Sequence, residues 1–183
     1  MTVSMPFRHI TVLIFSCLFL VFAGCATKPQ KSTTLNQNTL RTLQQQKLDT
    51  RLPIPVQGVS RKQLSDTWGA ARSQGRRHEG IDIMASKGTK VYSATNGLVA
   101  SLKGNNLGGT VVWIIGPSGS WHYYAHLHKH KRGLNEGDYI RKGDLIGYVG
   151  NSGNAKHTAP HLHYGIYLSG KGRGATNPYP YLR

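Results

Sequence analysis

Cysteine is nearly absent from this sequence of 183 residues, which contains only Cys17 and Cys25. Both lie near the start, so residues 26–183 contain no thiol. That part of the chain therefore cannot form a disulfide, use a cysteine nucleophile or build a cysteine-ligated metal site. Any domain in it must be held together by its hydrophobic core, with or without a metal bound by other ligands.

Acidic residues are also scarce, with 7 Asp and Glu against 23 Lys and Arg, and the net charge is +16. So basic a chain attracts anions, although charge of this kind can also serve solubility alone. Nucleic acid is the usual anionic partner, but the export signal described next argues against it. The remaining candidates are anionic cell-wall polymer and phospholipid head groups.

The chain lacks an apolar run long enough to cross a membrane, which takes about 20 residues. Its longest apolar stretch spans residues 10–23 and follows Arg8. A basic start and a core of about 7–15 apolar residues are typical of a signal peptide. The sequence therefore predicts a signal peptide over residues 1–24.

The end of this signal, "VFAGC" at residues 21–25, resembles the lipobox of bacterial lipoproteins. In that motif, small residues precede a cysteine that is lipidated and becomes the first residue of the mature chain. Phe22 departs from the aliphatic residue usual at its position, and an ordinary secretory signal is the alternative. The resemblance implies lipidation of Cys25. Ala26 after it implies an outer-membrane lipoprotein that faces the periplasm.

Residues 25–58 are polar, and we expect them to tether the anchor to a domain at residues 59–183. Their scattered leucines allow at most a short, weak helix, which Pro53 and Pro55 would end. Fully stretched, such a tether would reach on the order of 110 Å. The domain could then search the space beside its membrane.

Short runs of β-branched and aromatic residues alternate with glycine-rich turns from residue 68 onward. Examples are Thr110–Ile115 and Asp144–Val149, and Asn96-Gly97 is one of the turn pairs. No long stretch has the 3.6-residue apolar period of an amphipathic helix. The pattern predicts an all-β domain with antiparallel sheets of short strands.

Two segments, "HEGID" at 78–82 and "HLH" at 161–163, concentrate residues that bind metals. On a strand, His78 and Asp82 would share one face, and the two imidazoles of the second segment would likewise point at one spot. Zinc accepts such a set of two imidazoles and one carboxylate. Spacing alone leaves open which histidine of the pair binds.

A zinc site with three protein ligands keeps a fourth position for water, whose pKa then falls toward about 7. His126 and the histidine left over from the pair would be available as base, acid or oxyanion stabiliser. Glu79 makes the segment begin like the helical pattern H-E-x-x-H, but the fifth position is Asp82. On a strand Glu79 would face away from His78, so we do not favour it as the base.

Several segments in order over residues 64–182 resemble LytM/lysostaphin-type zinc metallopeptidases. They are Trp68-Gly69 with His78–Asp82, Gly88–Gly97, Tyr124–Leu127, Gly137–Gly147 and Gly150–His163. The run at 105–109 departs from the family's usual short turn. The resemblance implies an all-β fold of the duplicated-hybrid-motif type with an open groove.

Carried over by motif, the resemblance implies one Zn²⁺ per domain, bound by His78, Asp82 and His163. It implies catalytic, non-ligating roles for His126 and His161. The implied activity is a zinc endopeptidase that hydrolyses peptide cross-links of peptidoglycan. For a protein anchored in the outer membrane, the bond that we expect it to hydrolyse is the D-alanyl–diaminopimelate cross-link. Some relatives cleave a glycine bridge instead.

Other relatives have lost these residues and only activate wall hydrolases. A non-enzymatic activator of a cell-wall amidase, or a plain peptidoglycan-binding lipoprotein, is therefore the alternative. The expected partners are peptidoglycan, the membrane through Cys25, and a regulatory protein as a further candidate.

Three weaker hypotheses concern other segments. The "HLHKHK" tract at 126–131 has the composition of a metal-binding segment, but a solvated basic loop or a wall-binding patch explains it better. Tyr124 and Tyr164 flank the candidate catalytic histidines, and packing is favoured over a hydrogen bond to an oxyanion. Residues 137–147 also resemble a biotinyl or lipoyl carrier hairpin, but no modifiable lysine sits at a hairpin tip.

Overall fold

A computed structural model of the chain describes residues 1–2 and 36–183. Most of the predicted signal peptide and the predicted lipidation site at Cys25 lie outside the described residues. None of the helices in the described part combines the length and the apolar composition that a bilayer crossing requires.

Nine antiparallel strands form one sheet in the part of the chain that the structure describes. The strands are β1 (Ile81–Met84), β2 (Lys90–Tyr92), β3 (Gly97–Ser101), β4 (Thr110–Ile115), β5 (Trp121–His130), β6 (Tyr139–Ile140), β7 (Leu145–Val149), β8 (His161–Tyr167) and β9 (Ala175–Thr176). The helical segments are α1 (Gln37–Gln45), α2 (Tyr179–Leu182), η1 (Arg61–Gln63), η2 (Ser73–Gly75), η3 (Pro117–Gly119) and η4 (Gly153–Ala155). The prediction of an all-β antiparallel domain is confirmed.

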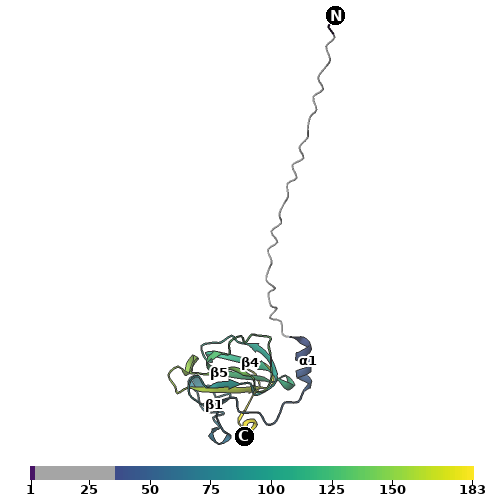
Figure 1. Ribbon diagram of the computed structural model, residues 1–183. Coiled ribbons are helices and arrows are strands. Elements are labelled where there is room, and N and C mark those ends of the chain that lie inside the picture. The colour runs from purple at the N-terminus through teal and green to yellow at the C-terminus, as the bar shows by residue number, and fades with distance from the viewer. Residues whose placement is uncertain (3–35) are drawn as a thin grey trace. The chain divides into compact units, whose positions relative to one another are not determined.

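Strand β5 lies between β8 and β4 in the sheet, whose main path runs β1-β8-β5-β4-β3-β6. Figure 1 labels β1, β4 and β5. The first half of β5 pairs with β8, from Trp121 opposite Tyr167 to Ala125 opposite His163. Its second half, from Leu127, pairs with β7 instead. The change of partner falls at His126, so this residue lies where the sheet divides.

The two faces of the sheet carry different side chains, as the two-residue period of a strand requires. One face builds the main core, which includes Tyr124 on β5 and Leu162 on β8. The other face carries a smaller aromatic cluster around Trp113, Tyr123 and Tyr167. The residues that the sequence predicts as a site lie beside this second face.

Residues 37–58 were predicted as part of a tether, and in the structure they pack against the domain. Helix α1, labelled in Figure 1, buries Leu43. It packs against η3. Farther along, Leu52 donates its backbone N–H to the Tyr181 carbonyl at 2.7 Å, and Val56 forms a bridge with Val91. Isolated apolar residues in a polar stretch gave no periodic signal, which is why the sequence did not predict this packing.

Candidate metal centre

Three side chains converge at one edge of the sheet: His78, Asp82 and His163. Each offers one ligand atom, and these atoms all lie within 4.8 Å of one another. Asp82 on β1 lies directly opposite His163 on β8 in the antiparallel register, so the two share a face. They form the one such group in the described residues.

His78 lies just before β1 and reaches the same point. Its backbone is hydrogen-bonded to residues 69 and 70. Its N–H donates to the Ala70 carbonyl at 2.9 Å, and its carbonyl accepts from Gly69 at 2.9 Å. The ring Nδ1 lies 2.7 Å from the Thr67 carbonyl oxygen. Since a carbonyl only accepts, Nδ1 carries the proton and Nε2 presents its lone pair to the site.

The three ligand atoms lie slightly closer together than in a tetrahedral zinc site. His78 Nε2 lies 3.0 Å from Asp82 Oδ1 and 2.8 Å from His163 Nδ1. His163 Nδ1 lies 3.3 Å from Asp82 Oδ1. Ligands about 2.0–2.2 Å from a tetrahedral zinc are about 3.3–3.6 Å apart, so a small expansion accommodates the ion. The residues therefore fit a zinc ion bound by one carboxylate and two imidazoles.

The second oxygen of Asp82 has a different partner, Arg72, whose guanidinium donates to Oδ2 at 2.5 Å. The Asp82 backbone N–H donates to Thr67 Oγ1 at 3.0 Å. These contacts leave Oδ1 as the oxygen that faces the two imidazoles. The sequence did not indicate Arg72 or Thr67 as site residues, because the hairpin that brings Arg72 to Asp82 has no periodic pattern.

The ionisation of Asp82 suits a metal ligand. Burial opposes its charged form, but hydrogen bonds and charge from His163 and His78 outweigh burial and hold the pKa of Asp82 well below its ordinary value. Burial lowers the pKa of His163, although its contact with Asp82 works in the other direction. Both groups are thus in their metal-binding forms at neutral pH.

Gly80 leaves room for the ring of His163. A Cβ at this position would lie 2.7 Å from His163 Cε1 and 2.6 Å from the Tyr164 carbonyl oxygen. The second contact is to backbone and cannot relax easily. Glycine is thus required here for space.

His161 lies two residues before His163 on β8 and faces the same site, as the two-residue period predicts. Its Nδ1 lies 2.9 Å from the Ala159 carbonyl oxygen, so this nitrogen donates. Its Nε2 lies 3.9 Å from Asp82 Oδ1, beside the ligand set. The structure therefore places His161 close to the ligand set, with Nε2 facing it.

His126 reaches the site through an irregularity in β5. Tyr124 faces the core, so an uninterrupted strand would send the side chain two residues later to the core as well. The backbone of His126 instead adopts φ 60°, in the left-handed region, and the register with β4 shifts between Thr110 and Val112. The bulge reverses the alternation: His126 faces the site and Leu127 enters the core.

Two backbone carbonyls hold His126 in place, one through its ring and one through its backbone N–H. Its Nδ1 donates to the Ser152 carbonyl at 2.9 Å, and its backbone N–H donates to the Gly108 carbonyl at 2.8 Å. Burial, followed by the nearby His163 and His161, lowers the pKa of His126 to about 4. At neutral pH the ring is therefore uncharged, with Nε2 available to accept a proton.

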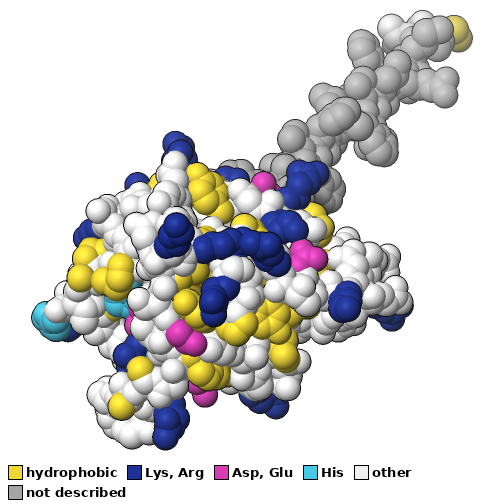
Figure 2. All heavy atoms as spheres, turned by 90° about the horizontal axis from the view of Figure 1, so that it is seen from below, with side chains coloured by type: hydrophobic (Ala, Val, Ile, Leu, Met, Phe, Trp, Pro, Cys, Tyr) yellow, Lys and Arg dark blue, Asp and Glu magenta, His cyan; other side chains and the backbone are white. Residues whose placement is uncertain are grey.

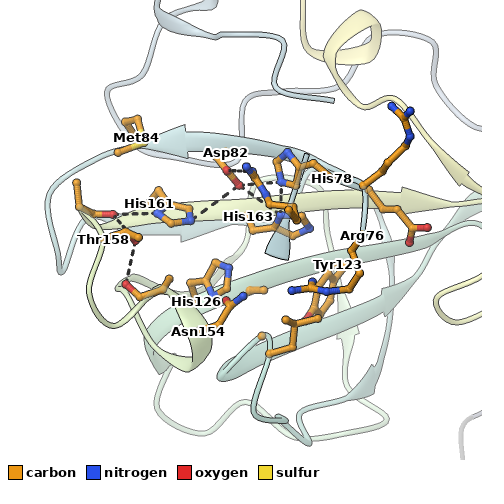
Figure 3. A pocket seen from close by; sticks show the side chains of 18 of the residues that line it. Arg76, His78, Asp82, Met84, Tyr123, His126, Asn154, Thr158, His161 and His163 are labelled. Carbon is orange, nitrogen blue, oxygen red and sulfur yellow. Dashed lines mark hydrogen bonds and ion pairs between the residues drawn. The ribbon is translucent and has the colours of Figure 1, made fainter. Parts of the chain in front are cut away.

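These residues line an open cavity of about 630 Å³. Figure 3 shows the histidines and Asp82 between Met84 and Thr158 at one end and Arg76 at the other. Tyr123 lines the cavity, and burial raises its pKa to about 12, so its phenol stays a neutral hydrogen-bond donor. No residue of the segment 36–58 lines it.

Tyr124 and Tyr164 are fully buried on the core face. The Tyr124 hydroxyl accepts the Ala94 N–H at 2.9 Å, and the Tyr164 hydroxyl lies 2.7 Å from His122 Nδ1. The favoured packing role of these two tyrosines agrees with their position. Tyr123, one residue earlier, is the tyrosine that reaches the cavity, and the strand period could have identified it.

The remaining candidates lie outside the ligand set. Glu79 is exposed at the rim of the cavity. His128 is exposed, and His130 Nε2 donates to the Val111 carbonyl at 2.8 Å. The "HLHKHK" tract therefore forms no second metal group in the described residues.

An open site with two histidines and one carboxylate as ligands is typical of catalytic zinc sites, including those of metallopeptidases. Residues 76–178 match the model of Peptidase family M23, and the chain belongs to that family. The resemblance to LytM and lysostaphin is thereby confirmed.

Two similar proteins of known name are endopeptidases. The chain is 37% identical to the L-Ala–D-Glu endopeptidase of Bacillus subtilis, over 72% of this chain and 42% of that protein. It is 35% identical to the DD-carboxypeptidase/endopeptidase Mpg of Neisseria meningitidis, over 67% of this chain and 25% of that protein. The chain thus spans less than half the length of these two relatives.

The fold is similar to that of the catalytic domain of lysostaphin from Staphylococcus simulans. The TM-score is 0.57 and the identity 30%, and the match covers 64% of this chain and 89% of that domain.

Proposed function

We propose that this protein is a zinc-dependent endopeptidase that hydrolyses peptide cross-links of bacterial peptidoglycan. The observation that carries the proposal is the convergence of His78, Asp82 and His163 in one open cavity, with His126 and His161 beside them. A zinc ion held by the first three would supply Lewis acidity and lower the pKa of a bound water.

The protein's own histidines would move the protons. His126 presents an unprotonated Nε2 at neutral pH, so it can accept a proton from water and later deliver it to the departing amine. His161 presents its Nε2 from β8, beside Asp82, and can share this task. Tyr123, a neutral phenol at the cavity wall, can donate a hydrogen bond to the developing oxyanion.

The basic surface suits an anionic wall polymer. Figure 2 shows one face on which Lys and Arg side chains far outnumber Asp and Glu. Such a field would concentrate the protein on its substrate and would weaken at high salt.

For the scissile bond we propose the D-alanyl–diaminopimelate cross-link. The Mpg relative, named a DD-carboxypeptidase/endopeptidase, supports this bond, whereas the Bacillus relative acts on an L-Ala–D-Glu bond. The two bonds yield fragments of different mass, so one digest distinguishes them.

The test is digestion of isolated sacculi by purified, zinc-loaded protein, followed by mass analysis of the released fragments. We expect uncrosslinked peptides from the wild type and none after treatment with a chelator, with recovery on addition of zinc. His163→Ala should abolish both zinc binding and release, whereas His126→Ala should retain zinc and lose release.

An exposed histidine provides the control, since His157→Ala should digest sacculi like the wild type. Release that persists in the chelated protein would refute the proposal. Release that appears only when a wall amidase is added would favour the non-enzymatic activator instead.

We also propose, from the sequence, that Cys25 is lipidated and anchors the protein in the outer membrane, facing the periplasm. Metabolic labelling with a fatty acid tests this directly. Label should be found in the wild type and absent from Cys25→Ala, and equal labelling of both would refute the anchor.

A further inference from the structure

The hairpin that leads into His78 places arginines at the cavity. Ala71 and Arg77 form a bridge, and the Arg72 N–H donates to the Arg76 carbonyl at 2.9 Å. The hairpin therefore pairs Arg72 with Arg76 and ends at the metal-ligand candidate His78. Its geometry is fixed by backbone hydrogen bonds on both arms.

Arg76 points to the side of this hairpin that faces the site. It precedes His78 by two residues in an extended segment, and alternate residues of such a segment share a face. Arg76 is half-buried and lines the cavity at the end opposite Met84 in Figure 3. Arg77 is exposed.

The two site-facing arginines differ in whether an acidic side chain balances their charge. Arg72 donates to Asp82. Among the described residues, Arg76 has no acidic side chain within 4.0 Å. One of its nitrogens donates to Ser73 Oγ at 3.0 Å, which orients the guanidinium and leaves its other donors unused. A fixed guanidinium with unused donors is suited to a carboxylate.

We propose that Arg76 determines specificity by binding the carboxylate on the carbon that bears the scissile nitrogen. The inference rests on the proposed function. In peptidoglycan, D-Glu of an L-Ala–D-Glu bond and diaminopimelate of a D-alanyl cross-link both carry a carboxylate on that carbon. A glycine bridge has none there. Arg76 would thus favour both stem-peptide bonds over a glycine bridge.

The test measures binding, so that its failure is distinguishable from a failure of the proposed hydrolysis. The probes are two D-alanyl–diaminopimelate cross-linked fragments in which CO–CH₂ replaces the scissile amide. One carries the free carboxylate beside this linkage, and the other carries a carboxamide there. Calorimetric titration of the zinc-loaded full chain gives the Kd of each.

The wild type should bind the carboxylate probe about tenfold more tightly than the carboxamide, as expected for a charge-assisted hydrogen bond. Arg76→Gln should reduce this ratio to less than twofold. Arg132→Gln, which removes the same charge at an exposed position outside the cavity, should keep the tenfold ratio.

Equal affinity of the wild type for the two probes would overturn the inference. So would a preference that survives in Arg76→Gln or disappears equally in Arg132→Gln. A wild type that shows the preference but does not digest sacculi would support the carboxylate contact and refute the hydrolysis.

Discussion

Acid should destabilise this fold through His122, a histidine buried on the core face of β5. Its side chain has no exposed surface, and burial lowers its pKa to about 3. Ser120 Oγ already donates to the Pro117 carbonyl, so it accepts from His122 Nε2 at 3.1 Å. His122 Nδ1 then accepts from the Tyr164 hydroxyl at 2.7 Å. Protonation of Nδ1 would break this last hydrogen bond.

The sign and size of the effect follow from proton linkage. The folded pKa lies below that of an unfolded histidine, about 6.5, so the unfolded state binds more protons between these values. The contribution is fully present above pH 6.5 and is lost as the pH falls toward 3. It amounts to about 2 kcal/mol between pH 7 and pH 5 for this one group.

The assay is urea unfolding followed by tryptophan fluorescence at several pH values, with a chelator present so that metal release does not contribute. The variant His122→Asn retains an acceptor for Tyr164 but does not titrate. At pH 7 the unfolding free energy of this variant should be lower than that of the wild type. Between pH 7 and pH 5 the variant should lose about 2 kcal/mol less of it than the wild type does. The exposed His157→Asn is the control and should follow the wild type.

Parallel loss of stability in the wild type and in His122→Asn would refute this reasoning. It would mean that His122 titrates in the folded protein near its ordinary pKa, and that its buried hydrogen bonds do not oppose protonation.

Three further predictions concern the site. Gly80→Ala should displace the ring of His163 and weaken zinc affinity at least about tenfold, measured by competition with a chromogenic chelator; unchanged affinity would contradict the steric argument. Ser152→Ala removes the hydroxyl that bonds the Leu127 carbonyl at 2.8 Å beside His126, so kcat should fall while zinc affinity stays constant; a loss of zinc would instead mean that the whole site collapses. Zinc at 100 times its Kd should raise the unfolding free energy by about 2.7 kcal/mol, and His163→Ala should remove this gain in the same urea assay.

The sequence predicted the fold class because short β-branched and aromatic runs, separated by frequent turn pairs and without a long helical period, favour antiparallel strands. It also predicted that His161 and His163 share a face, since that follows from strand geometry alone. Which of the two belongs to the ligand set was not decided by spacing. The register of β1 against β8 places His163 directly opposite Asp82, which brings His163 into the candidate ligand set.

Contacts that depend on irregular backbone could not be predicted from the sequence, and only the tertiary structure revealed them. The direction of His126 results from a bulge that no period predicts, and it arises where β5 changes its pairing partner. Arg72 reaches Asp82 because the two arms of its hairpin pair through backbone hydrogen bonds. The sequence pattern does not predict this pairing. Composition and sequence period indicate which residues of a strand share one face. Only the pairing of distant segments decides which faces meet, because each such contact depends on how the whole sheet closes.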